Sequence, residues 1–127
     1  MTLTQTLWIG IGGFFGTLGR YTVSTMVYRY LGVSFPYGTL TVNLVGCFLF
    51  GLVSGLFEER HLLTPATRLF LTVGVLGGFT TFSSFGDETL VLLKSGKPVV
   101  AGLYVGASIL VGVLAVWIGG VVAKAAW

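Results

Sequence analysis

Apolar residues dominate four long stretches of this chain, and short polar turns separate one stretch from the next. Because a bilayer core about 30 Å thick needs about 20 apolar residues per helix, each stretch is long enough to cross a membrane. The turns are short, so neighbouring helices should pack against each other. The pattern predicts one all-α transmembrane domain over residues 1–127, with spans near 4–29, 37–57, 67–94 and 99–123.

The composition agrees with residence in a membrane. Of the 127 residues, 54% are hydrophobic and 9% are charged, and the mean hydropathy is +0.95. An ordinary soluble domain has about 25% charged residues. The net charge is +3, but the basic residues are scattered singly, which argues against a nucleic-acid partner. The first residues carry no basic side chain and no small-residue cleavage pattern follows them, so we expect no removable signal peptide.

The basic residues do not favour one orientation in the membrane, although basic loops normally stay cytoplasmic. Arg60, Arg68 and Lys124 fall on the side of the termini, Arg29, Lys94 and Lys97 fall on the opposite side, and Arg20 lies inside a span. The balance is either an accident of small numbers or a sign that copies insert in both directions and pair antiparallel. Such a homodimer would supply the inverted repeat on which many transport folds are built.

Each predicted span contains two glycines spaced four residues apart. These pairs are Gly12 and Gly16, Gly51 and Gly55, Gly74 and Gly78, and Gly102 and Gly106. The spacing removes side chains from one helix face, so that two helix backbones can approach closely. Packing within one chain and packing between two chains both explain it. The pairs therefore predict a compact bundle without choosing between these explanations.

The third predicted span carries a helix-weakening sequence near its middle. Gly77 and Gly78 weaken the helix, and the hydroxyls of Thr80 and Thr81 can satisfy or redirect the peptide groups that are freed. Within a bilayer, backbone can leave the helical conformation only where protein or a wet cavity covers it. We therefore expect a third helix that is broken at its centre, with carbonyls able to coordinate a small hard cation.

Polar side chains inside a span are costly, which makes them candidates for function. Arg20 either anchors the first helix at the interface or forms an electropositive vestibule that attracts anions. Thr39 and Asn43 share one face of the second span, and Asn43 either joins helices or offers amide donors to a ligand. Tyr104 and Ser108 repeat that spacing in the fourth span and present two hydroxyls along one stripe.

Beyond the expected break, Phe82 and Phe85 share a helix face, and Glu88 follows three residues later. Aromatic rings have positive edges, so a phenylalanine presented edge-on can contact an anion without a strong binding charge. Packing against the core or against lipid is the more ordinary interpretation of two such rings. Asp87 and Glu88 are expected to mark the approach to the water interface.

At these residues the chain resembles a known family, the small four-helix fluoride channels of microbes. The resemblance covers almost the whole chain and is carried by Gly16-Thr-Leu-Gly-Arg20-Tyr21, by Gly38-Thr-Leu-Thr-Val-Asn43-Leu-Val-Gly46-Cys-Phe48, and most specifically by Gly74-Val-Leu-Gly-Gly-Phe-Thr-Thr-Phe-Ser-Ser-Phe85. Two positions depart from the pattern. Ser84 stands where threonine is common, and Gly112 supplies no hydroxyl one turn beyond Ser108.

The resemblance implies an antiparallel, dual-topology homodimer in the inner (plasma) membrane, with two pores and a structural sodium ion at its centre. The carbonyls of Gly77 and Thr80 from both subunits would hold the sodium. The implied function is passive, fluoride-selective export that relieves fluoride toxicity. In the implied path, ring edges come from Phe82 and Phe85, and hydrogen-bond donors come from Asn43, Tyr104 and Ser108. The second-rank candidates are Thr39, Ser83 and Ser84. The surroundings of the path would include Arg20 and Glu88.

Three other functional classes are alternatives to the channel, namely an exporter, a scaffold subunit and an enzyme. A small dual-topology, proton-coupled multidrug exporter also uses four short helices, but it requires a carboxylate deep in the first span, where this chain carries Arg20. A scaffold subunit would require only the glycine packing. An enzyme is not expected, because His61 is the sole histidine and no nucleophile or metal arrangement surrounds it in the sequence. Cys47 is interpreted as a small buried hydrophobe.

Overall fold

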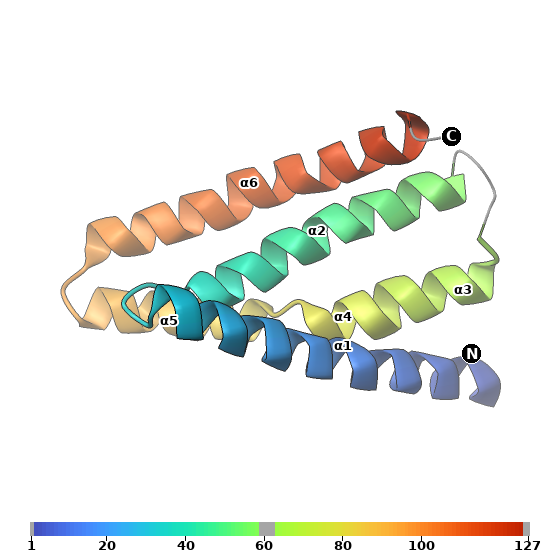
Figure 1. Cartoon of the computed structure of the whole chain (residues 1–127), viewed down its shortest axis with the longest axis horizontal. Helices are drawn as coiled ribbons and strands as arrows, with labels where there is room; N and C mark the ends of the chain where they lie inside the picture. Colours follow the sequence, from blue (N-terminus) through green and yellow to red (C-terminus); the bar gives the residue numbers. More distant parts are fainter. Residues whose placement is uncertain (1, 59–62, 126–127) are drawn as a thin grey trace.

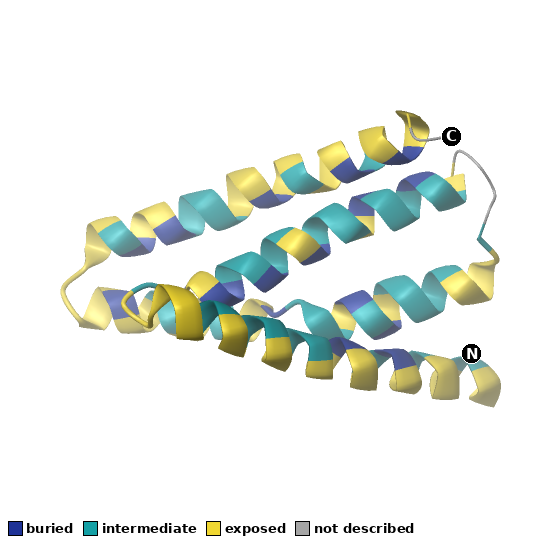
Figure 2. Cartoon of the chain, viewed as in Figure 1, coloured by how far each residue is buried: buried dark blue, intermediate teal, exposed yellow. Residues whose placement is uncertain are grey.

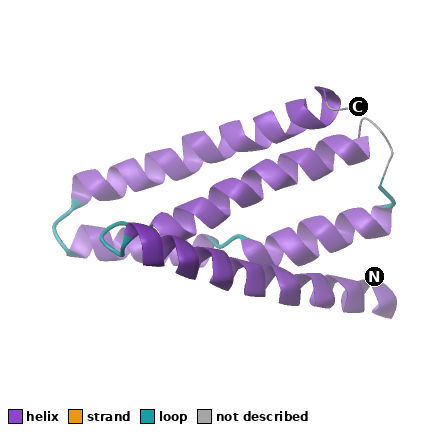
Figure 3. Cartoon of the chain, in the orientation of Figure 1, coloured by secondary structure: helices purple, strands orange, loops and turns teal. Residues whose placement is uncertain are grey.

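The computed structural model describes residues 2–58 and 63–125, so Arg60 and His61 lie outside the described residues. Within these ranges the chain forms helices joined by short loops (Figure 3). Four helical rods run alternately up and down, so that both termini and the end of α2 lie at one end of the bundle (Figure 1). The rods are α1 (Leu3–Leu31), α2 (Tyr37–Glu58), a segmented third rod, and α6 (Pro98–Ala125). The all-α prediction with four helices is confirmed.

The third rod consists of four consecutive helical segments. They are α3 (Pro65–Leu69), the π-helical turn η1 (Phe70–Leu76), α4 (Gly77–Phe79) and α5 (Phe82–Lys94). Between α4 and α5 the backbone is extended, with φ −85° and ψ 159° at Thr80 and φ −149° and ψ 120° at Thr81. The expected break in the third helix is therefore present, and Figure 3 shows it as a loop inside the rod.

The break falls within the glycine and threonine segment that the sequence indicated, at the two threonines of that segment. Gly77 and Gly78 are helical, and the two residues that leave the helix are Thr80 and Thr81. Gly78 serves packing instead, because a Cβ added to it would lie 2.6 Å from the carbonyl oxygen of Gly13 on α1. The glycines bring two helices together, and the threonines form the break.

Local sequence signals set the ends of the helices. At the start of α1, the Thr2 hydroxyl accepts from the amide of Gln5 and the Gln5 side chain accepts from the amide of Thr2, which forms a capping box. Gly32 ends α1 at φ 80°, a backbone conformation that disfavours side chains. Gly96 ends α5 in the same way at φ 71°, and Pro98 then opens α6.

The rods pack in two pairs, with α2 along α6 and α1 along the first half of the third rod (Figure 1). Added Cβ atoms at the glycine pairs of α1, α2 and the third rod would collide with backbone or side chains of the same chain. The fourth pair, Gly102 and Gly106, has no such neighbour within 4 Å among the described residues. Packing within the chain therefore explains three of the glycine pairs and leaves one face of α6 open.

Three of the described helices are long and apolar enough to span a membrane, namely Tyr37–Glu58, Pro65–Lys94 and Pro98–Ala125. The α1 helix has 29 residues, which is about 43 Å at about 1.5 Å per residue, but its mean hydropathy is lower than theirs. Exposed residues follow the outer faces of the rods (Figure 2), and many of them are large apolar residues. Such a surface suits lipid or a second copy of the chain rather than water.

The buried core is small and lies beside α5. Leu92, Ala101 and Tyr104 are buried there, and Phe35 and Phe85 pack against them. This cluster joins α5 to α6 on the side of the break away from the chain termini. It fixes the position of Tyr104, which is fully buried and whose hydroxyl belongs to the polar site described next.

Candidate functional site

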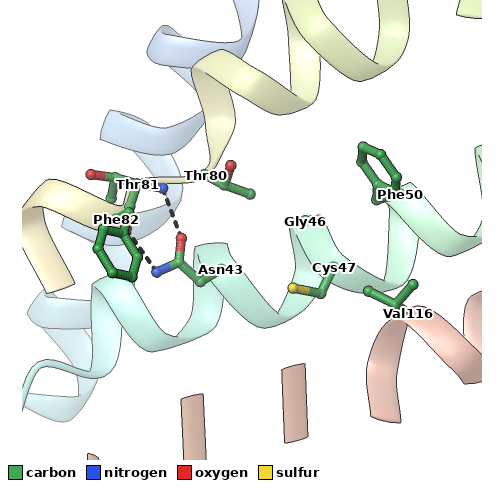
Figure 4. A pocket seen from close by; sticks show the side chains of 8 residues that line it. All are labelled: Asn43, Gly46, Cys47, Phe50, Thr80, Thr81, Phe82 and Val116. Carbon is green, nitrogen blue, oxygen red and sulfur yellow. Dashed lines mark hydrogen bonds between the residues drawn. The ribbon is translucent and has the colours of Figure 1, made fainter. Parts of the chain in front are cut away.

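The break in the third rod is held by Asn43 on α2. The Asn43 Oδ1 atom accepts a hydrogen bond of 2.8 Å from the Thr81 amide, and Asn43 Nδ2 donates one of 3.0 Å to the Thr81 carbonyl (Figure 4). One side chain therefore satisfies both peptide groups of a residue that has left the helix. Of the two interpretations of Asn43, these contacts support the one in which it joins helices.

Thr81 also begins α5. Its Oγ1 accepts from the amide of Ser84 at 3.2 Å, which caps the first turn of that helix, and lies 3.1 Å from Ser84 Oγ and 3.4 Å from Ser83 Oγ. The hydroxyl groups of Thr81, Ser83 and Ser84 thus gather at the start of α5. Thr81 is buried, whereas Ser83 is exposed.

Two backbone carbonyls are released at the break. In a continuous helix the Thr81 amide would donate to the carbonyl of Gly77, but here it donates to Asn43. The carbonyl of Gly77 thereby loses its helical partner, and Gly77 is exposed. The Thr80 carbonyl receives a long hydrogen bond of 3.4 Å from Nη1 of Arg20. Both carbonyls are oxygen ligands of the type that broken helices offer to sodium.

Arg20 reaches into a cavity of about 400 Å³ between α1, α2 and the start of α5. The cavity wall carries one cation, Arg20, one carboxylate, Glu88, and several hydroxyls, including those of Thr39 and Ser84. The contact with Thr80 ties Arg20 to the break, while the cavity gives it access to small solutes. Arg20 is thus joined to the break and also lines a polar cavity.

Glu88 is surrounded by hydroxyl donors. Its Oε1 accepts from Thr39 Oγ1 at 2.6 Å and from Tyr28 at 3.1 Å, and its Oε2 accepts from Tyr104 at 2.7 Å. The donors come from α2, α1 and α6, so this carboxylate joins the third rod to all three others. Asp87 beside it is exposed, whereas Glu88 is half-buried among these hydroxyls.

Three aromatic rings form a row along α5 and α6. The centroids of Phe82 and Phe85 are 5.5 Å apart with an interplanar angle of 47°, and those of Phe85 and Tyr104 are 5.1 Å apart at 58°. These tilted arrangements direct ring edges toward neighbouring faces. Phe85 packs against the core, whereas Phe82 is 83% exposed on the surface of the single chain.

Ser108 has a buried hydroxyl. Among the described residues, none lies within hydrogen-bonding distance of its Oγ. Gly112, one turn further on the same face of α6, points toward α2, where a Cβ added to it would lie 3.6 Å from Cys47 Sγ. Cys47 in turn lines a cavity of about 280 Å³ together with Asn43, Thr81 and Phe82 (Figure 4). The face of α6 that carries Ser108 and Gly112 is thus directed toward α2 close to this cavity.

The structure brings most of the sequence-selected residues into two neighbouring clusters. The first surrounds the break and contains Arg20, Asn43, Thr80, Ser83 and Ser84. The second surrounds Glu88 and contains Thr39 and Tyr104. Sequence reasoning did not select Tyr28, because a tyrosine near the end of a span is typical of an interfacial aromatic residue. Only the fold reveals that its hydroxyl reaches Glu88.

Residues 7–120 match the model of the CrcB-like protein, Camphor Resistance (CrcB) family. A fluoride-specific ion channel FluC from Acidobacterium capsulatum is 47% identical over 91% of this chain and 93% of its own length. The protein of that name from Magnetococcus marinus is 45% identical over 94% and 98%. The one from Geobacter sp. strain M21 is 43% identical over 97% and 99%.

Proposed function

Because the chain belongs to the CrcB/FluC family of fluoride-specific ion channels, we propose that it conducts fluoride passively out of the cytoplasm, down its gradient. In this role it relieves fluoride toxicity and resides in the plasma membrane as a multi-pass protein whose α1 also crosses the bilayer. Family membership places the chain among channels rather than enzymes. It also sets aside the exporter and scaffold alternatives, which no contact in the structure favours.

The buried hydroxyl of Ser108 is the observation that carries this proposal. An unpaired donor inside an apolar helix pair costs free energy, about 1–3 kcal/mol for a neutral group. A small anion that accepts a strong hydrogen bond is a suitable missing partner. Ser108 lies one turn beyond the fully buried Tyr104 on the same stripe of α6, so two hydroxyls follow each other through the span.

The chemistry of the proposed path suits fluoride. A channel must replace the water around the ion with well-placed donors and still bind weakly enough for the ion to leave. Neutral hydroxyls and amides together with ring edges meet both requirements. We assign the donor roles to Asn43, through the second N–H of its amide, to Ser108, and to Tyr104, whose hydroxyl proton would have to turn from Glu88 to the ion. Phe82 and Phe85 supply ring edges, and Thr39, Ser83 and Ser84 are supporting hydroxyls. Arg20 provides positive potential at the cavity beside the break, which favours anion entry.

The working unit that we propose is an antiparallel, dual-topology homodimer with two pores. One chain leaves the ring of Phe82 83% exposed, so a second copy is needed to enclose a path along it. The glycine face at Gly102 and Gly106 is open in the single chain and allows close approach of another helix. The described basic residues Arg68 and Lys124 lie near the termini, and Arg29, Lys94 and Lys97 lie at the other end, so neither orientation is strongly favoured.

A structural sodium ion at the dimer centre is part of the proposal. The carbonyls of Gly77 and Thr80 fit such an ion, because the break removes the helical partner of Gly77 and leaves Thr80 with one long contact. Two copies would supply two carbonyls each. The ion would stabilise the pairing of the two breaks and would not be transported.

Reconstitution tests the proposed activity. The purified chain in liposomes loaded with potassium fluoride is expected to release fluoride rapidly once a potassium carrier balances the charge. The release should need no proton gradient and is followed with a fluoride electrode. Release that requires a proton gradient, or no release above that from protein-free liposomes, would contradict a passive fluoride channel.

A further inference from the structure

Tyr28 is a residue that the channel function described above does not use, although it contacts the Glu88 carboxylate. It lies near the end of α1, and its hydroxyl donates to Glu88 Oε1 at 3.1 Å. The same hydroxyl lies 3.5 Å from Thr39 Oγ1, which is the second donor to that oxygen. Tyr28 and Thr39 therefore share one carboxylate oxygen, and Tyr104 holds the other.

The approach of Tyr28 depends on Gly38. Gly38 is buried in the first turn of α2, and a Cβ placed on it would overlap the Tyr28 ring at Cε2, Cζ and Cδ2. Even alanine at this position would push the ring away from Glu88. The glycine thus clears the space in which the tyrosine ring lies, and the ring length then brings the hydroxyl to the carboxylate.

Tyr28 and Glu88 also stand between two cavities. One is the cavity of about 400 Å³ that contains Arg20, Thr39 and Ser84. The other has a volume of about 240 Å³ and is lined by the loop residues Ser34, Phe35 and Pro36. Tyr28 and Glu88 line both cavities. The hydrogen bond between these two side chains therefore lies in the wall that the cavities share.

We propose that Tyr28 is a positioning residue of the fluoride path, which holds the Glu88 carboxylate in the wall between these two cavities and partly neutralises its charge. The inference rests on the proposed channel function and adds a residue to it. A carboxylate beside an anion path repels the anion. Hydroxyl donors directed at its oxygens reduce this repulsion, and Tyr28 supplies one of the three that the described structure contains.

Removal of this donor has a predictable sign. In Tyr28→Phe, Glu88 Oε1 keeps only Thr39, so its charge is less well compensated at the cavity wall. Fluoride then meets a more negative potential, and a higher concentration is needed to fill the path. A hydrogen bond to a charged group is worth roughly a tenfold change in an equilibrium constant. We expect the half-saturating fluoride concentration to rise by up to roughly that factor.

The test is the fluoride concentration dependence of initial efflux from liposomes for the wild type, Tyr28→Phe, Gly38→Ala and the double variant. Tyr30→Phe is the matched control, because Tyr30 lies on the same helix and is 78% exposed. We expect a raised half-saturating concentration in Tyr28→Phe and in Gly38→Ala, and no further increase in the double variant, because both changes remove one contact. Tyr30→Phe should behave as the wild type.

Two results would overturn the proposal. One is an unchanged half-saturating concentration in Tyr28→Phe. The other is a lower maximal rate at an unchanged half-saturating concentration together with a lower melting temperature, which would assign Tyr28 a purely structural role. Failure of the proposed channel function is recognised separately, because the wild type itself would then release no fluoride.

Discussion

The side-chain amide of Asn43 pairs with both peptide groups of Thr81, accepting from its N–H at 2.8 Å and donating to its C=O at 3.0 Å. A peptide that leaves a helix inside an apolar bundle must find such partners, because no water reaches it there. Asn43 thus makes the break possible, and the break in turn exposes the carbonyl of Gly77 and begins α5 at the site.

Replacement of Asn43 by alanine should destabilise the fold. The change leaves the Thr81 amide and carbonyl unpaired in a buried position, at about 1–3 kcal/mol each and so about 2–6 kcal/mol in total. We expect a clear fall in the apparent midpoint of thermal unfolding in detergent, followed by far-ultraviolet circular dichroism. Ser83→Ala, at an exposed position in the same region, serves as the control. A midpoint for Asn43→Ala equal to that of the wild type would show that the two hydrogen bonds of Asn43 do not hold the break.

Replacement of Ser108 by alanine should separate stability from function. The hydroxyl has no partner among the described residues, so its removal should leave the unfolding midpoint unchanged or raise it slightly. Fluoride efflux should nevertheless fall by roughly tenfold, because one donor on the path is lost. Ser95→Ala is the control, since that exposed hydroxyl bonds to the carbonyl of Val91 in its own helix. Undiminished efflux from Ser108→Ala would remove Ser108 from the path.

Replacement of Phe82 or Phe85 by isoleucine should slow fluoride efflux while the dimer persists. Isoleucine keeps an apolar side chain of moderate size but has no positive ring edge, so a reduction of roughly two- to tenfold is expected. Size-exclusion chromatography reports the dimer, and the fluoride electrode reports the efflux. Leu93→Ile is the control, because Leu93 is 50% exposed on the same helix. Wild-type rates in both phenylalanine variants would refute a role of the rings in conduction.

Removal of sodium should destabilise the dimer. An ion bound only by the folded assembly stabilises it by an amount that grows with the logarithm of the ion concentration over the dissociation constant, about 2.7 kcal/mol at a hundredfold excess. Exchange of sodium for N-methylglucamine is therefore expected to lower the melting temperature, and readdition of sodium should restore it. Potassium at the same ionic strength is the control. Equal melting temperatures with sodium and with N-methylglucamine would argue against the central ion.

The sequence predicted the helices well, because long apolar stretches bounded by Gly32, Gly96 and Pro98 leave few alternatives. It also predicted that the third helix would be broken. It did not show that Gly77 and Gly78 stay helical, because glycines weaken a helix in isolation. In the bundle Gly78 packs against α1, while Asn43, which is remote in sequence, captures Thr81. Local propensity could not reveal that capture, since it depends on tertiary contacts.

Most of the polar residues that the sequence singled out lie near the break or around Glu88, but their partners were not predictable. The sequence indicated only that Glu88 approaches the water interface, and the structure shows hydroxyls from three other rods around its carboxylate. No pattern in the sequence predicted the contact of Tyr28 with Glu88, because that contact depends on the space that Gly38 leaves on another helix. Spacing along one helix identifies residues that share a face, whereas contacts between helices require the fold.

The central claim is that neutral donors and ring edges take over the hydration of fluoride in a path too confined for larger halides. The direct test compares the release of fluoride and of chloride from liposomes that contain the wild-type chain, under the same potassium-carrier conditions. We predict rapid fluoride release and chloride release no faster than from protein-free liposomes. Comparable rates for the two anions would contradict the claim.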